Sequence, residues 1–371
     1  MTSEQDTYTP TDLLIREHGK RCTTHTLLTK DGYELTLHRL INPIGLRGMK
    51  QTILMHHGLL GSSADWILLG PEKSLPYYLS TLGYDVWFAN ARGNRYSQRH
   101  QNTMLNSTKY YDFSWQEIGL YDLPAIIDYV RRQTNEPLNF IGHSMGATAL
   151  LVLLSSVPKY NDFLRMAILL GPLVYMKNIK GPLRIISLMT EPPLEDFFKI
   201  LGNGAFVPSR KLPDNLLKRF CLNEVLLCGN PLFFMSGVPR NHTQWSEYFT
   251  KLLFQHIPAG GSTKTFLHYA QLVKSGKFHK FGEVDQEFPL KEVTTPVALI
   301  SSSDDWLASI PDLVRLYINI FNPIEHYIIR DRNISHTDFV WGPNANKLVF
   351  PKVIELLQTT SQVVGKQAND V

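Results

Sequence analysis

The sequence is poor in the features that mark disulfide scaffolds, membrane spans and nucleic-acid binding. Its three cysteines, Cys22, Cys221 and Cys228, are too few for a disulfide framework. The longest apolar stretch, at 147–154, is far too short to cross a bilayer. The formal net charge is only +4 and no dense block of lysine and arginine occurs, so a nucleic-acid partner is not expected.

The N-terminal residues do not show the pattern of a signal peptide. The first ten residues, MTSEQDTYTP, are polar and contain no apolar run of the kind found in a signal peptide. Three N-x-S/T sequons, at Asn106, Asn241 and Asn333, are only a weak sign of a secretory route. What the chain does have is an ordinary globular composition, 43% hydrophobic and 19% charged. Its 371 residues fit a core of roughly 250 residues plus a large insertion.

Strands and helices are predicted to alternate along most of the chain. Asp31-Gly32 separates two alternating segments and predicts a β-hairpin. Short apolar runs predict strands at 51–58, 84–93, 138–142, 165–172, 295–303 and 325–331. Helical spacing predicts helices at 74–83, 114–133 (interrupted near Pro124), 145–157, 310–321 and 346–360. This alternation predicts a mostly parallel sheet with helices on both faces.

One region interrupts this rhythm. From about Pro172 to Thr294 the chain is rich in proline, phenylalanine and leucine and shows no regular strands. We expect it to form a mainly helical cap, inserted between two strands of the sheet. The predicted division is therefore a first core part at 11–171, a cap or lid insertion at 172–294, and a second core part at 295–362.

A candidate nucleophile stands between a predicted strand and a predicted helix. Gly142, His143, Ser144, Met145 and Gly146 form a G-x-S-x-G pattern there. This is the context of a nucleophile elbow, in which a serine hydroxyl projects above the sheet from a tight turn. The flanking glycines are expected because the strand and helix backbones pass too close for a Cβ. The alternative is a glycine-rich turn with an idle serine.

A serine hydroxyl needs a base to take its proton and a carboxylate to orient that base. After an elbow serine, the acid and then the histidine follow along the chain. His326 lies inside a predicted strand, whereas His336 follows that strand at the sheet edge where functional loops gather. His336 is therefore the candidate base, with a surface-loop histidine as the alternative. Asp304 and Asp305 both follow the strand at 295–303, and position alone does not separate them.

An oxyanion hole needs two backbone N–H groups aimed at the developing negative charge. Met145, directly after the serine, is expected to supply one. The loop HHGLLGSS, directly after the apolar residues QTILM, is expected to supply the other, from Leu59. His56 and His57 lie in this loop but precede the serine, so we interpret both as structural.

Several segments in order along the chain carry a family resemblance. They are MHHGLLGSSADW, YDVWFANARGNRYS, YDLPAIIDYV, IGHSMGATA, HIPAGGSTKTFLHYAQLVKSGKF, SDDWLA and SHTDFVWG. Together they resemble the acid lipases, the family that contains gastric lipase and lysosomal acid lipase. The likeness extends from about Thr11 to Leu357, nearly the whole chain.

The resemblance implies an α/β-hydrolase fold with a helical cap that includes a lid. The implied activity is hydrolysis of triacylglycerols or cholesteryl esters. It supports Ser144 as nucleophile, His336 as base, and Leu59 and Met145 as oxyanion donors. The family's acid directly precedes Trp or Leu in a D-W-L-A-like stretch, which matches Asp305.

The resemblance also bears on a disulfide, the location and the partners of the protein. The family carries a cap disulfide that corresponds to Cys221 and Cys228. A secreted or lysosomal location is usual for it, although the polar N-terminus leaves a cytoplasmic location open. The expected partners are a lipid ester substrate and a lipid–water interface, without nucleic acid or a transmembrane segment, and the chain is expected to be a monomer. No metal or organic cofactor is required by any motif.

Two other functions compete with a neutral-lipid hydrolase. One is a carboxylesterase or thioesterase for soluble esters, which the large apolar cap disfavours because such a cap suits lipid acyl chains. The other is a catalytically inactive lipid-binding relative. Loss of a triad member would be typical of such a relative, and none is lost here.

Overall fold

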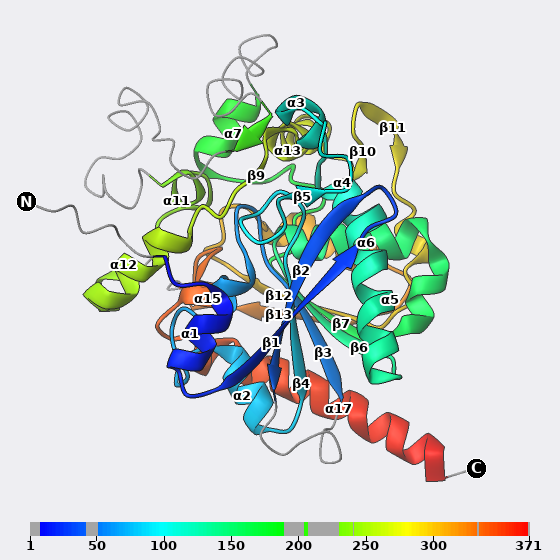
Figure 1. Cartoon of the computed structure of the whole chain (residues 1–371). Helices are drawn as coiled ribbons and strands as arrows, with labels where there is room; N and C mark the ends of the chain where they lie inside the picture. The colour runs from blue at the N-terminus through cyan, green and yellow to red at the C-terminus, as the bar shows by residue number, and fades with distance from the viewer. Residues whose placement is uncertain are drawn as a thin grey trace, which may run out of the picture.

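A central, mostly parallel sheet organises the computed structural model, which describes residues 8–41, 51–188, 204–206, 230–239, 241–331 and 334–369 (Figure 1). The strand order is β1-β2-β4-β3-β6-β7-β12-β13, and β5 pairs with β2. The strands are β1 (Arg21–Leu28), β2 (Tyr33–Ile41), β3 (Thr52–His56), β4 (Asp85–Ala89), β5 (Arg99–His100), β6 (Leu138–His143), β7 (Leu164–Leu170), β12 (Val297–Ser302) and β13 (Pro323–Ile329).

Strand direction follows from the connections. β1 and β2 form the expected antiparallel hairpin, with Leu28 opposite Glu34, and β2 runs antiparallel to β4. From β4 to β13 every neighbouring pair is parallel. Parallel neighbours need a crossover, so most strands are separated by a helix. The carboxyl ends of these strands therefore meet at one edge of the sheet.

Two apolar layers cover the two faces of the sheet. Neighbouring residues along a strand point to opposite faces, so Leu169 packs in one layer and Leu170 in the other. One layer includes α5 (Leu123–Thr134), α6 (Met145–Ser156) and α14 (Ile310–Asn319). The other includes α1 (Thr11–Glu17), α2 (Leu75–Thr81) and α17 (Phe350–Asn369). The predicted class, helices on both faces of a mostly parallel sheet, is confirmed.

Two predicted helices are each divided in the structure. The segment 114–133 forms α4 (Trp115–Glu117), a π-helical turn η3 (Ile118–Asp122) and α5, which has Pro124 in its first turn. The prediction of a single helix at 346–360 is wrong. The segment forms α16 (Ala345–Leu348) and α17, and Pro351 lies in the first turn of α17. Proline fits a first turn because its missing N–H has no helical partner there.

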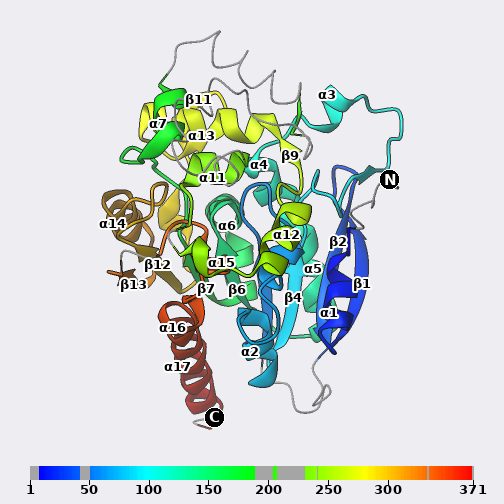
Figure 2. The ribbon, with the colours of Figure 1, turned by 90° about the vertical axis from the view of Figure 1, so that its left-hand side faces the viewer.

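The insertion lies between two strands that are neighbours in the sheet, β7 and β12. Its described helices are α7 (Gly181–Ser187), α11 (Pro231–Ser236), α12 (Glu247–His256) and α13 (Thr263–Ser275). Figures 1 and 2 show α7 and α13 at one end of the molecule and α17 at the other. His268 of α13 ties the insertion to the core, because its ring stacks on Trp115 at 3.6 Å and its Nδ1 lies 2.9 Å from Ser114 Oγ. The proposed domain limits remain predictions.

Short elements complete the described chain. The insertion also contains strands that its sequence did not suggest, in two small antiparallel pairs. They are β8 (Ala205–Phe206), β9 (Gly261–Ser262), β10 (His279–Lys280) and β11 (Glu283–Glu287). The remaining helices and 3-10 turns are η2 (Ser63–Trp66), α3 (Ser107–Tyr110), η4 (Pro158–Phe163), η5 (His242–Gln244), η6 (Leu290–Glu292) and α15 (Asp338–Trp341).

Some sequence predictions fall outside the described residues. Cys221, Cys228 and the sequon at Asn333 are among them, so the disulfide stays a prediction. Cys22 is buried and free. No helix within the described ranges is both long and apolar enough to cross a bilayer.

Candidate active site

Ser144 occupies the sharp turn between β6 and α6. Its φ of 53° and ψ of −115° lie outside the regions that a non-glycine residue normally adopts. The turn is fixed on both sides, because Ser144 N donates to Leu170 O at 2.9 Å and Ser144 O accepts from Ala147 N at 3.0 Å. Such a strained residue persists only where its surroundings hold it. Its side chain is buried beneath other residues.

The two glycines of the motif are needed for close approach. A Cβ at Gly142 would lie 2.9 Å from Ala147 N, and a Cβ at Gly146 would lie 2.6 Å from His56 O. Both distances are shorter than real Cβ contacts. The expectation that strand and helix pass too close for side chains is therefore confirmed.

His336 reaches the serine from the loop after β13. Its Nε2 lies 2.8 Å from Ser144 Oγ, and its Nδ1 lies 2.8 Å from Asp305 Oδ2. A carboxylate only accepts hydrogen bonds, so Nδ1 carries a proton and Nε2 is the acceptor for the serine hydroxyl. This is the tautomer that a general base needs.

Asp305 is buried beyond the carboxyl end of β12, and its hydrogen bonds favour its charged form. Its Oδ1 accepts from Leu307 N at 2.8 Å and Ala308 N at 2.9 Å. Burial alone would raise the pKa of Asp305. The charge of His336 and the hydrogen bonds from His336, Ala308 and Leu307 outweigh burial and hold that pKa below its ordinary value. Asp304 is half-buried, and it is Asp305 that contacts His336.

The loop that contains Leu59 packs directly against the serine. A Cβ at Gly58 would lie 3.2 Å from Ser144 Cβ. Gly58 O accepts from His57 Nδ1 at 2.8 Å and from Gly61 N at 3.2 Å. Gly58 C=O and Leu59 N–H belong to one trans peptide and point in opposite directions, so these contacts also fix Leu59 N–H. Neither Leu59 N–H nor Met145 N–H has a protein acceptor among the described residues.

His56 and His57 support this loop from inside the core. Both rings are buried, and burial lowers the pKa of His56 to about 4 and that of His57 well below its ordinary value. His57 Nε2 accepts from Ala91 N at 3.1 Å. His326, the rejected candidate base, lies on β13 and contacts Ser301 Oγ at 2.8 Å.

Sequence reasoning did not predict the supporting contacts of three residues, one of which, His143, it named only as part of the elbow. His143 Nε2 lies 2.9 Å from His336 O, and Ser302 Oγ donates to Ile334 O, so both hold the loop of the histidine. A Cβ at Gly171, whose φ is 54°, would lie 3.2 Å from Asp305 Oδ2. His143 lies inside the G-x-S-x-G pattern, and this position is the sequence signal that could have indicated its supporting role.

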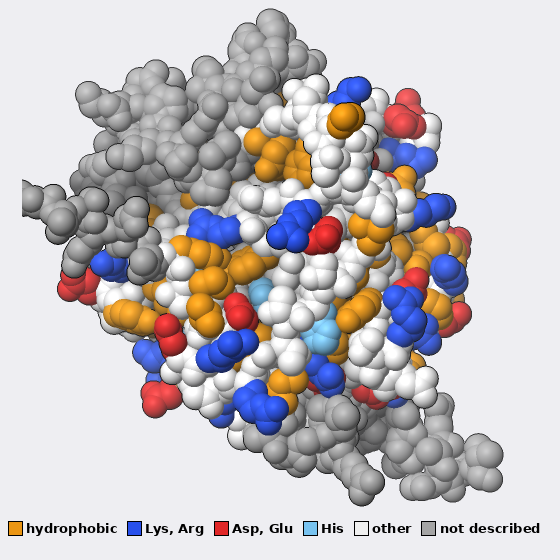
Figure 3. Space-filling view, in the orientation of Figure 1, with side chains coloured by type: hydrophobic (Ala, Val, Ile, Leu, Met, Phe, Trp, Pro, Cys, Tyr) orange, Lys and Arg blue, Asp and Glu red, His pale blue; other side chains and the backbone are white. Residues whose placement is uncertain are grey.

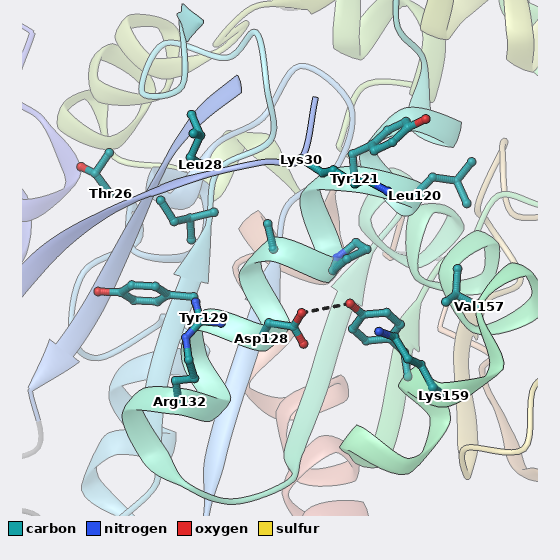
Figure 4. A pocket seen from close by; sticks show the side chains of 14 residues that line it. Thr26, Leu28, Lys30, Leu120, Tyr121, Asp128, Tyr129, Arg132, Val157 and Lys159 are labelled. Atoms are coloured by element: carbon teal, nitrogen blue, oxygen red, sulfur yellow. Dashed lines mark hydrogen bonds between the residues drawn. The ribbon is translucent and has the colours of Figure 1, made fainter. Parts of the chain in front are cut away.

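A second hollow lies away from these residues. The groove of Figure 4 is bounded by β1, by η3 and α5, and by the α6–η4 connection, and none of the candidate site residues lines it. On the face drawn in Figure 3, lysine and arginine side chains lie among acidic and apolar ones rather than in one block. Within the described residues, no cluster of three or more His, Cys, Asp or Glu side chains could hold a metal ion.

The sheet order, the serine turn and the Ser144–His336–Asp305 contacts define the class of the protein, an α/β-hydrolase. A family model described as "alpha/beta hydrolase fold" matches residues 51–343, and one described as "partial alpha/beta-hydrolase lipase region" matches residues 11–70. A soluble variant of monoglyceride lipase from Saccharomyces cerevisiae has a similar fold, with a TM-score of 0.55 at 15% identity over 90% of this chain and 94% of that one.

Curated relatives resemble the chain over nearly its full length. Lipase 3 of Drosophila melanogaster is 36% identical over 93% of this chain and 92% of its own. Gastric triacylglycerol lipase of Rattus norvegicus is 32% identical over 93% and 90%. Lysosomal acid lipase/cholesteryl ester hydrolase of Homo sapiens is 30% identical over 89% and 86%. The chain belongs to the acid lipase family of α/β-hydrolases, and it is a carboxylic ester hydrolase.

Proposed function

We propose that the protein hydrolyses carboxylic esters of neutral lipids, triacylglycerols or cholesteryl esters, through an acyl-enzyme on Ser144. The observation that carries the proposal is the continuous hydrogen-bonded path from Ser144 through His336 to Asp305, each step 2.8 Å long. The names of the gastric and lysosomal relatives support the substrate class.

The proposed reaction has two halves. Ser144 Oγ attacks the ester carbonyl carbon while His336 Nε2 takes the hydroxyl proton, and Asp305 stabilises the resulting imidazolium. Leu59 and Met145 N–H groups bind the negative oxygen that forms. The C–O bond breaks and the leaving alcohol takes the proton from His336. Water then attacks the acyl-enzyme and gives a proton to His336. The bond between the acyl carbon and Ser144 Oγ breaks, the carboxylic acid leaves, and His336 returns that proton to Ser144 Oγ.

A substrate panel at acid and neutral pH tests this function. The panel is tributyrin, triolein, cholesteryl oleate and a soluble nitrophenyl ester, assayed with wild type and with Ser144→Ala. We expect hydrolysis of the lipid esters, and a higher rate on emulsified long-chain esters than on the same acyl groups presented as monomers. Turnover of the soluble ester alone would identify a soluble-ester hydrolase, and no turnover of any ester would identify an inactive lipid-binding relative.

We also propose that the protein acts in a secretory or lysosomal compartment. Family membership supports this location, as do the sequons at Asn106 and Asn241. The Asn106 side chain is exposed at the start of α3, where a glycan has room. Expression in a secretory host followed by peptide N-glycosidase should give a mobility shift, and Asn106→Gln should reduce it. An unchanged mobility of the wild type would contradict glycosylation at Asn106 and Asn241 and, with it, this support for a secretory route.

A further inference from the structure

The residue before the serine contacts the histidine loop directly. His143 is the last residue of β6, and its ring is buried. Its Nε2 lies 2.9 Å from the backbone oxygen of His336, and the two imidazole rings are 5.1 Å apart between centroids. One side chain therefore joins the turn that carries Ser144 to the main chain that carries His336.

The contact fixes the protonation of His143. A backbone carbonyl only accepts, so Nε2 must carry the proton and donate it. The other ring nitrogen, Nδ1, faces the Leu59 loop, because a Cβ at Gly58 would lie 3.0 Å from it. Burial, together with the charge of His336, lowers the pKa of His143 to about 3. The ring is therefore neutral at neutral and mildly acidic pH.

We propose that His143 is a positioning residue: its Nε2–H holds the main chain of His336 and thereby keeps the imidazole of His336 at hydrogen-bonding distance from Ser144. The proposal rests on the proposed function, because it assigns a role within the same reaction.

Other contacts also hold this loop, beside the bonds from the His336 side chain to Ser144 and Asp305. Ser302 Oγ binds Ile334 O on one side of His336, and Ser335 N donates to Asp338 Oδ2 at 2.8 Å within the loop itself. The His143 contact differs from these, because it reaches the main chain of His336 from β6, the strand that leads into the turn of Ser144. A reacting pair misplaced by about 1 Å loses on the order of 100-fold in rate, so a contact of this kind matters for turnover.

Two substitutions of similar size separate the hydrogen bond from packing. The amide nitrogen of glutamine stands about as far from the Cβ as Nε2 of histidine, so His143→Gln retains a donor for His336 O. His143→Met has a similar length and no donor. Rates on a soluble ester are expressed per phosphonate-titratable Ser144, so that only folded enzyme is counted, and melting temperatures are measured for both variants.

We expect His143→Met to lower kcat by about 10- to 100-fold with KM within about threefold, and to slow phosphonate labelling of Ser144. His143→Gln should recover most of that kcat, to within about fivefold of wild type, at a similar melting temperature. Equal kcat losses in both variants, or no loss in His143→Met, would overturn the positioning role. Failure of the proposed function gives a different result, since wild type itself would then lack Ser144-dependent hydrolysis.

Discussion

The candidate site and the groove of Figure 4 differ in the exposure of their polar side chains. At the site, Ser144, Asp305 and His336 are at most 3% exposed and hydrogen-bonded to one another. In the groove, the side chains of Lys30 and Arg132 are exposed, and apolar residues such as Val157 line it beside them.

This difference in exposure indicates which of the two regions is suited to catalysis. Burying a polar or charged group costs free energy unless it is paired, so a buried Ser–His–Asp path is retained only where its geometry is needed. Exposed lysine and arginine side chains cost little and need no partner. The groove's own carboxylate, Asp128, accepts from Tyr160 at 3.1 Å, which ties η4 to α5 (Figure 4). We therefore expect large effects of substitution at the site and small effects in the groove.

The largest effect should come from Ser144→Ala. Without the hydroxyl no acyl-enzyme forms, so kcat should fall by several orders of magnitude, about 10⁴-fold or more, because triad members act as a unit. A serine-directed phosphonate should label wild type at Ser144 alone, as checked by peptide mass spectrometry. Full activity in the variant would place the chemistry elsewhere.

The two neighbouring aspartates provide the next test. Asp305→Asn should lower kcat by about 10³- to 10⁴-fold, because the amide cannot stabilise the imidazolium and favours the wrong tautomer of His336. Asp304→Asn is the matched control and should stay within roughly tenfold, since it is Asp305 that binds His336. Steady-state rates on a soluble ester measure both. The reverse ranking would assign the acid to Asp304.

Asp65 makes stability depend on pH beside the Leu59 loop. Asp65 lies in η2, where its Oδ1 accepts from Ser62 N at 3.1 Å, and burial raises its pKa to about 8. Between about pH 4 and pH 8 the unfolded chain has lost this proton while the folded chain keeps it, so Asp65 lowers stability as pH rises through that window.

Asp65→Asn removes the titration while preserving shape. The melting temperature of the variant relative to wild type should therefore increase from pH 5 to pH 8, by about 5 °C. Differential scanning fluorimetry at both pH values measures the difference. A constant offset between variant and wild type across this range would mean that Asp65 titrates normally in the folded chain.

The sequence predicts those parts of the fold and site that depend on residues close together in the chain. The β-hairpin, the elbow and His336 are read from local patterns, because strand, turn and helix signals lie within a few residues. The Arg92 guanidinium contacts Asp122 at 2.7 Å and Asp31 at 2.6 Å. It therefore joins three segments that lie far apart in the chain. The bond from His143 to His336 O spans 193 positions. Contacts of that kind require the tertiary fold.

The smallest effects should come from the groove. Lys159→Gln and Arg132→Gln remove exposed charges that are remote from the residues we assign to catalysis. Surface substitutions of this kind change the free energy of unfolding by about 0.5 kcal/mol or less. Activity on a soluble ester should therefore stay within about twofold of wild type, and the melting temperature should hardly move. Rates of the same variants on emulsified triolein extend this comparison with wild type to a lipid substrate. A loss of tenfold or more on the soluble ester would show that the groove is coupled to Ser144 and would break the contrast between the two regions.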